Sequence, residues 1–212
     1  MNNRPHAGTF AAIAAIAGWI SLLIQLVLHL ENRVTAIPES ILRYFTYFTI
    51  LTNILAASTY TAVWVKPSTG WMKKLTTSSW ISAVTVYMTI VGIIYNTILR
   101  NVRPIYGVGI LVDEFLHVIL PLSILFFWIL FVRRSELKWK MALTWLSYPI
   151  GYILLVMLVG ALTGFYPYPF ANAGKLGYPK ALTNGFWVLI GFLVLSLVLI
   201  GIGKIKKVNI KM

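Results

Sequence analysis

A hydroxyl, an imidazole and a carboxylate, the three groups of a nucleophilic triad, occur at spacings that a helical protein can bring together. Thr46, His117 and Asp113 supply them. A threonine hydroxyl attacks a carbonyl once a neighbouring base removes its proton, and histidine is the usual base. Asp113 precedes His117 by four residues, so on a helix the carboxylate can orient the imidazole. Structural interpretations are also open, because threonines line helix contacts in membranes and a buried histidine can simply pair with a carboxylate.

Other polar side chains near this triad are candidates for binding a substrate. Arg43, Thr46, Thr49 (or Ile50) and Asn53 recur at the spacing of one helical face. An asparagine on that face can stabilise an oxyanion, and an arginine fits the geometry of a carboxylate. The candidate substrate-binding residues are Arg43, Asn53, Glu114, Arg103 and Tyr168.

Tyr168 belongs to a segment, TGFYPYPF over residues 163–170, in which tyrosine and proline alternate. Proline stiffens such a segment, and aromatic residues favour the membrane–water interface. The segment is either an aromatic connector at the interface or a lid over a polar cavity. In the second case Tyr168 contacts the substrate.

The composition points to lipid as the main solvent. Of the 212 residues, 59% are hydrophobic and 11% charged, whereas soluble domains carry about a quarter charged residues. The net charge of +13 comes from clusters at the ends of apolar runs, which suits anionic headgroups better than nucleic acid. The absence of cysteine excludes disulfides, thiolate nucleophiles and thiolate metal sites. We expect no metal and no organic cofactor.

Six runs meet the length of about 20 apolar residues that a membrane span needs. They cover residues 8–30, 41–65, 79–99, 109–132, 141–164 and 183–203. The connections between them are too short for a soluble domain. The sequence therefore predicts an all-α integral membrane protein, with residues 1–212 forming a single compact bundle of six transmembrane helices.

The distribution of basic residues predicts the orientation of the bundle. Twelve of the 18 fall on one side: Arg4, Lys66, Lys73, Lys74, Arg133, Arg134, Lys138, Lys140, Lys204, Lys206, Lys207 and Lys211. Six fall on the other: Arg33, Arg43, Arg100, Arg103, Lys175 and Lys180. Because basic residues are retained in the cytoplasm, both termini are predicted to lie inside, with the cell membrane as the expected location.

Ionisable residues within or beside the spans gather toward the predicted outer face. They are His29, Arg43, Asp113, Glu114 and His117. Such residues are costly in a membrane and mark functional sites, so we expect a polar cavity that opens outward. At a rise of 1.5 Å per residue, Thr46 lies about 8 Å and His117 about 12 Å below the outer boundary. Pro121 is expected to kink the fourth span one turn below His117.

Three segments resemble one family. RYFTYFTILTN (residues 43–53), LHVILP (116–121) and GYILLVMLVGALTGFYPYPF (151–170) are similar to segments of the androgen-induced-gene family, which includes the androgen-dependent tissue-factor-pathway-inhibitor-regulating protein. The resemblance covers essentially the whole chain and implies six spans. It also implies hydrolysis of fatty acid esters of hydroxy fatty acids or similar acyl esters, with Thr46 as nucleophile and His117 as base.

Three other functions remain open at the level of sequence. The first is a non-catalytic lipid-binding or transport protein that uses the same outward-facing polar cavity. The second is a b-type haem protein with His29 and His117 as axial ligands. The third is a structural or regulatory membrane protein. The expected partners are a lipid or fatty-acyl ester and the membrane itself; the sequence does not predict the oligomeric state.

Overall fold

The computed structural model describes residues 5–102 and 104–204, and all regular structure within these ranges is helical. Six stretches there are long and apolar enough to cross a membrane, as the sequence predicted. They are α1 (Pro5–Glu31), α3 (Phe48–Val65), α5 (Ser78–Ile94) with the π-helix η1 (Tyr95–Leu99), α6 (Val108–Glu114) with the π-helix η2 (Phe115–Ile119) and α7 (Leu120–Phe131), α8 (Met141–Trp145) with α9 (Ser147–Thr163), and α11 (Tyr178–Lys204). The short elements are α2 (Ile37–Thr46), α4 (Gly70–Lys74), η3 (Arg134–Glu136), η4 (Pro169–Ala171) and α10 (Ala173–Leu176).

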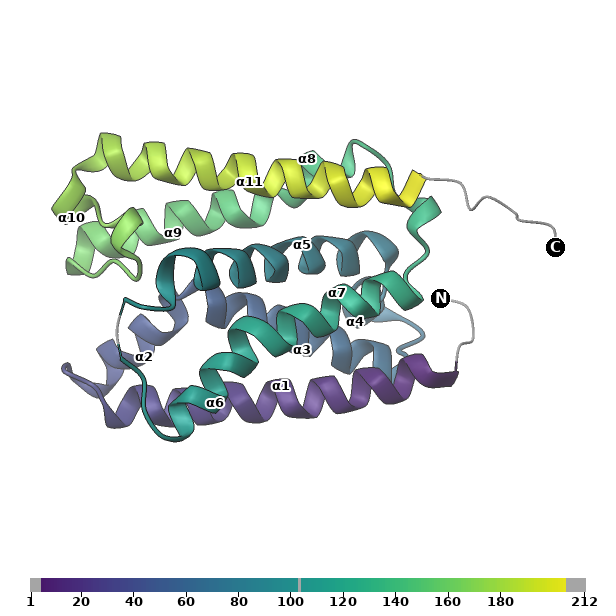
Figure 1. Cartoon of the computed structure of the whole chain (residues 1–212), viewed down its shortest axis with the longest axis horizontal. Helices are drawn as coiled ribbons and strands as arrows, with labels where there is room; N and C mark the ends of the chain where they lie inside the picture. Colours follow the sequence, from purple (N-terminus) through teal and green to yellow (C-terminus); the bar gives the residue numbers. More distant parts are fainter. Residues whose placement is uncertain (1–4, 103, 205–212) are drawn as a thin grey trace.

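The two ends of the bundle differ. α1 begins and α11 ends at the same end, on the right of Figure 1. We call this the basic end, because its described residues include Lys66, Lys73, Lys74, Arg133, Arg134, Lys138, Lys140 and Lys204. The opposite end holds α2, α10 and the connections that follow η1 and α9 (Figure 1). We call it the chamber end, after the cavity described below.

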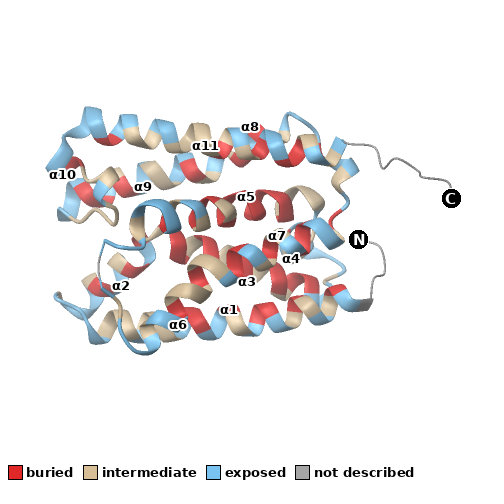
Figure 2. Ribbon diagram, in the orientation of Figure 1, coloured by how far each residue is buried: buried red, intermediate tan, exposed pale blue. Residues whose placement is uncertain are grey.

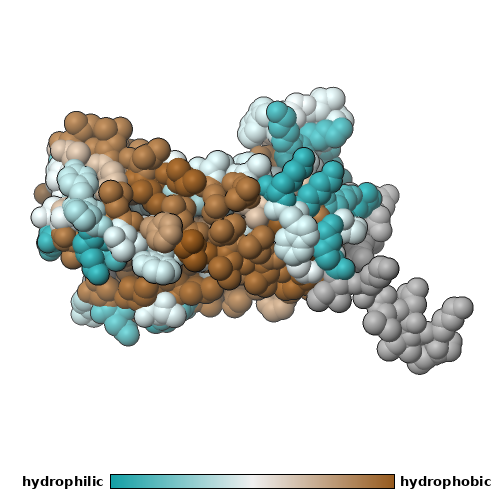
Figure 3. Space-filling model, turned by 90° about the horizontal axis from the view of Figure 1, so that it is seen from above, coloured by the Kyte–Doolittle hydropathy of each residue, from teal (hydrophilic) through white to brown (hydrophobic). Residues whose placement is uncertain are grey.

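Apolar side chains cover the middle of the bundle, and hydrophilic ones gather toward its ends (Figure 3). Many large apolar residues on the spans are exposed, among them Leu162 at 77% and Leu111 at 72%. A continuous apolar surface of this kind matches the hydrocarbon layer of a bilayer.

The best-packed part of the bundle is formed by α1, α3, α5 and α7, where buried residues cluster (Figure 2). Trp128, Tyr60 and Phe127 are fully buried there. Their polar atoms are satisfied: the Trp128 indole N–H donates to Ser82 Oγ at 2.8 Å, and Tyr60 shares a hydrogen bond of 3.0 Å with Ser123. Paired polar groups of this kind hold neighbouring spans together in one register.

The second predicted span is not one continuous helix. The sequence predicted a helix over residues 41–65, but α2 ends at Thr46 and α3 begins at Phe48. Tyr47 between them has an extended backbone, with φ −76° and ψ 126°. Of the two helices, only Phe48–Val65 is long and apolar enough to cross a membrane, so Thr46 ends α2 and is not part of that helix.

Tyrosines from a distant part of the chain stabilise this break. The Phe48 N–H donates to the Tyr152 hydroxyl at 3.2 Å, and the Tyr152 hydroxyl donates to the Thr46 carbonyl at 2.9 Å. The Thr49 N–H donates to the Tyr168 hydroxyl at 3.3 Å. These phenols replace bonds that a continuous helix would make, so the backbone groups at the break keep hydrogen-bond partners.

The fourth span is also irregular, close to Pro121. The π-helix η2 contains His117, and α7 with Pro121 follows it directly in the same continuous helix. Because a proline has no N–H, Pro121 cannot donate to the His117 carbonyl four residues back. The π-helix that contains the histidine therefore lies directly before the proline.

Candidate active site

A polar chamber of about 530 Å³ opens at the chamber end of the bundle. Its lining includes Thr49, Tyr95, Asp113, His117 and Tyr168, from four different parts of the chain. Two further cavities, of about 450 and 470 Å³, share Asp113 with it. The ionisable residues that the sequence placed toward one side therefore surround connected polar space.

The structure brings His117 and Asp113 together. His117 Nδ1 lies 2.9 Å from the Asp113 carbonyl oxygen and 3.2 Å from its carboxylate Oδ1. Both oxygens can only accept, so in the neutral imidazole Nδ1 carries the proton and Nε2 has the lone pair. A neutral imidazole in this tautomer can act as a base toward a group in the chamber.

Tyr95 contacts both members of this pair. Its ring stacks on the His117 ring, with a centroid distance of 3.8 Å and an angle of 16° between the planes. Its hydroxyl donates to Oδ2 of Asp113, the carboxylate oxygen that His117 does not use. Tyr95, Asp113 and His117 therefore form one hydrogen-bonded cluster, called here the histidine cluster.

Thr46, the threonine that the sequence singled out, is not among the residues that line the chamber. It is 1% exposed, and its hydroxyl donates to the Leu42 carbonyl at 2.7 Å, one turn earlier in α2. This is the common back-bond of a helical threonine. The Thr46 hydroxyl is therefore engaged within α2 and is not directed into the chamber that contains the histidine cluster.

Thr49 is the threonine that shares the chamber with His117. It lies in the first turn of α3, beyond the break at Tyr47. Its N–H donates to Tyr168 rather than to a carbonyl of α2, so this turn is held from outside its own helix. Thr49 carries a secondary hydroxyl at the point where the chamber meets a second, apolar pocket.

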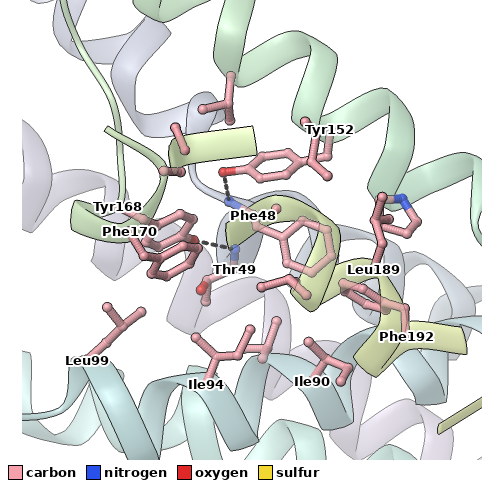
Figure 4. Close-up of a pocket in the computed structure, with 18 of the residues that line it drawn as sticks. Phe48, Thr49, Ile90, Ile94, Leu99, Tyr152, Tyr168, Phe170, Leu189 and Phe192 are labelled. Atoms are coloured by element: carbon pink, nitrogen blue, oxygen red, sulfur yellow. Dashed lines mark hydrogen bonds between the residues drawn. The ribbon is translucent and has the colours of Figure 1, made fainter. Parts of the chain in front are cut away.

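The apolar pocket runs between α5, α9 and α11 (Figure 4). It is narrow, about 70 Å³, and its walls include Ile90, Val156, Val188 and Phe192. Four residues line both cavities: Thr49, Tyr95, Leu99 and Tyr168. A ligand with a polar group in the chamber and a hydrocarbon chain in this pocket would place the join between the two beside Thr49.

Tyr168 is where the sequence analysis placed it, in contact with the cavity. Figure 4 shows its ring beside Thr49 and stacked with Phe170, at a centroid distance of 5.4 Å. Burial raises the pKa of the Tyr168 hydroxyl, so the group remains protonated and can donate a hydrogen bond. The segment 163–170 thus supplies part of the chamber wall.

The other predicted binding residues have different surroundings. Asn53 is fully buried, and its side-chain amide donates to the Thr49 and Leu116 carbonyls at 2.8 and 3.2 Å. It joins α3 to η2 and is not among the residues that line the chamber, and both of its N–H groups donate to backbone carbonyls rather than into the chamber. Arg103 lies outside the described residues.

The predicted charged binding residues occupy the rim. Arg43 pairs with Glu39 at 2.6 Å, lies 4.6 Å from the Phe165 ring centre and lines the 450 Å³ cavity. Glu114 pairs with Arg100 and lines the 470 Å³ cavity. Glu39 and Glu114 pair with arginines and not with the histidine cluster, so Asp113 is the carboxylate that pairs with His117.

Several chamber residues were missed by the sequence analysis. Gln25 and Tyr47 line both the chamber and the 450 Å³ cavity, and Lys175 lies at the chamber rim. A glutamine inside the apolar first span was a signal that could have been used. The repeated Phe-Thr pair, at Phe45–Thr46 and Phe48–Thr49, also offered two threonines rather than one.

Comparison with known proteins gives no further guidance, since no family model, curated protein or solved structure matches the chain. The roles that the resemblance implied for Thr46 and His117 therefore stay predictions. What the structure itself supplies is a histidine cluster in a polar chamber that joins an apolar pocket beside a threonine.

Proposed function

We propose that the chain is a membrane-embedded hydrolase of acyl esters, with Thr49 as nucleophile and His117 as base. The observation that carries this proposal is the junction of two cavities: the chamber that holds the His117–Asp113 pair meets the apolar pocket at Thr49. A carbonyl beside Thr49 would have its acyl chain in the apolar pocket and its alcohol part in the chamber. Fatty acid esters of hydroxy fatty acids, the substrates that the resemblance implies, carry an acyl chain on one side of the ester bond and the alcohol part on the other.

The steps of the proposed reaction use only side chains at the junction. His117 Nε2 takes the proton of the Thr49 hydroxyl as its oxygen attacks the ester carbonyl. The O–H of Tyr168 faces the developing oxyanion as a hydrogen-bond donor. His117 then gives the proton to the alcohol oxygen as the ester bond breaks. Water, activated by the same imidazole, hydrolyses the acyl-threonine and restores both residues.

Insertion into the cell membrane and orientation are part of the same proposal. The six apolar helices cross the bilayer, and the basic end, with its eight described lysines and arginines, faces the cytoplasm. The chain has no cysteine, so single cysteines can report the orientation. A membrane-impermeant maleimide added to intact cells is expected to label Val34→Cys and not Ser68→Cys. The reverse pattern would invert the proposed orientation.

The decisive experiment measures hydrolysis of a fatty acid ester of a hydroxy fatty acid by the purified protein. Thr49→Ala and His117→Asn are expected to lower kcat/KM at least about 10³-fold. Thr61→Ala is the matched control, since Thr61 lies on the same span but its hydroxyl donates to the Ala57 carbonyl. It is expected to retain full activity, and Thr46→Ala to stay within about threefold of the unmodified protein.

The other outcomes are informative as well. Loss of activity in Thr46→Ala but not in Thr49→Ala would return the nucleophile to the residue that the resemblance implies. Equal activity in all variants would exclude the threonine mechanism. A protein that binds such esters without cleaving them would favour the lipid-binding or transport alternative.

A further inference from the structure

Tyr95 lies where two irregular helices face each other. It is the first residue of η1, and His117 is the central residue of η2. A π-helix has an extra residue in its turn: here the Arg100 N–H donates to the Tyr95 carbonyl, five residues back, at 2.8 Å. Such turns are rare and often occur at functional sites. Two of them in adjacent spans bring one tyrosine ring onto one histidine ring.

The contacts of Tyr95 restrict the imidazole in two ways. The stacked phenol ring, 3.8 Å away, covers one face of His117 and limits rotation of the imidazole about its bond to Cβ. The phenol hydroxyl binds Oδ2 of Asp113 while His117 Nδ1 faces Oδ1. The carboxylate is therefore held from both sides, and its accepting oxygen stays directed at Nδ1. Partners of this kind fix the tautomer of a histidine.

We propose that Tyr95 is a positioning residue, which holds Asp113 and His117 so that Nε2 of the imidazole, without a proton, faces the chamber. It forms no bond to the substrate's reacting atoms and acts only through the other two residues. The inference rests on the proposed hydrolase for its kinetic consequence, but the placement of the imidazole proton can be measured without any substrate.

The two functions of Tyr95 can be separated by substitution. Tyr95→Phe keeps the stacked ring and loses the bond to Asp113, and Tyr95→Leu loses both. Tyr87→Phe is the matched control: Tyr87 lies two turns earlier in the same span, and its buried hydroxyl donates to the Trp145 carbonyl at 2.6 Å, away from the chamber. All three variants remove a buried tyrosine hydroxyl from one helix.

The direct test is the ring ¹⁵N spectrum of histidine-labelled protein. The chain has three histidines, and His117→Asn identifies the signals of His117. In the unmodified protein, we expect one protonated nitrogen, Nδ1, and one unprotonated nitrogen, Nε2. In Tyr95→Phe the two signals should move toward each other, as exchange between tautomers sets in, and in Tyr95→Leu they should move further. In Tyr87→Phe they should stay unchanged.

The kinetic test should rank the Tyr95 variants in the same order, with the larger effect in Tyr95→Leu. We expect kcat to fall about 10-fold in Tyr95→Phe and about 100-fold in Tyr95→Leu, with little change in KM, because positioning affects the chemical step. Unchanged ¹⁵N signals in Tyr95→Leu would overturn the proposal, whatever the change in kcat. If the unmodified protein shows no hydrolysis, the proposed function fails, and the ¹⁵N signals still decide whether Tyr95 positions the imidazole.

Discussion

The two ends of the bundle differ in how their backbone and buried polar groups are hydrogen-bonded. Toward the basic end, the buried polar side chains of α3, α5 and α7 bond to one another or to carbonyls of their own helix. Toward the chamber end, the regular backbone hydrogen bonding of three helical segments is interrupted. In the first region, the hydroxyls of Thr59 and Thr85 donate to carbonyls four residues back, at 2.7 and 2.8 Å. In the second region, the interruptions are the break at Tyr47 and the π-helices η1 and η2. The three cavities that Asp113 helps to line lie at this end of the bundle, beside these interruptions.

The comparison shows how a bundle of ordinary spans makes room for chemistry. A regular helix uses its peptide groups and its threonine hydroxyls internally, so it offers little to a ligand. An interrupted helix must obtain partners from elsewhere, as α3 does from Tyr152 and Tyr168. The side chains that supply those partners also form the walls of the cavity. The tightly packed core and the cavity walls thus occupy different halves of the same spans.

The largest effect on stability is expected in the packed half. Trp128→Ala removes a fully buried indole and its bond to Ser82, so the free energy of unfolding should fall by about 3–5 kcal/mol. Equilibrium unfolding in detergent micelles measures the change. Trp187→Ala is the control, because Trp187 is 65% exposed on the apolar surface and its loss should cost less than about 0.5 kcal/mol. Equal losses would mean that the packed half is not the stabilising one.

A smaller effect is expected at the wall of the chamber. A Cβ added to Gly160 would lie 2.1 Å from the ring of Tyr166, which lines the chamber. Gly160→Ala must therefore displace that ring, and we expect a loss of about 1–3 kcal/mol together with reduced hydrolysis. Gly151→Ala on the same helix is the control, since an added Cβ there meets no atom within 4 Å. Tyr166→Ala should restore stability to Gly160→Ala; if it does not, the contact is not the cause.

The smallest effect is expected from the ion pairs at the two ends. Glu114→Gln breaks the pair with Arg100 at the chamber end, and Glu136→Gln breaks the pair with Arg133 at the basic end. These side chains are 36–51% exposed, so each change should cost at most about 1 kcal/mol and less in high salt. Thermal unfolding at two salt concentrations tests this. A large, salt-independent loss for Glu114→Gln alone would show that Arg100 supports the chamber in another way.

The six long helices followed from the sequence because the length of an apolar run is a local property. The contact between Asp113 and His117 also followed from local spacing, four residues on one helix. The break at Tyr47 did not, since the hydroxyls that stabilise it come from Tyr152 and Tyr168, more than 100 residues later. The same applies to Tyr95, whose contact with His117 joins two spans and depends on two π-helices. Sequence periodicity assumes a regular helix, so it placed Thr46 and Thr49 on one face, whereas the structure puts Thr46 at the end of α2 and Thr49 in the chamber wall.

The π-helices carry a consequence for how this site can be gained or lost. Each holds one residue more than a regular turn, so removal of a single codon within Tyr95–Leu99 or Phe115–Ile119 would turn the segment into an ordinary α-helix. The turns on either side would stay nearly in register, because a wide turn takes up its extra residue locally, but the turn that brings Tyr95 and His117 together would be lost. A relative without the histidine cluster would then differ from this protein by one missing residue and still form the same six long apolar helices.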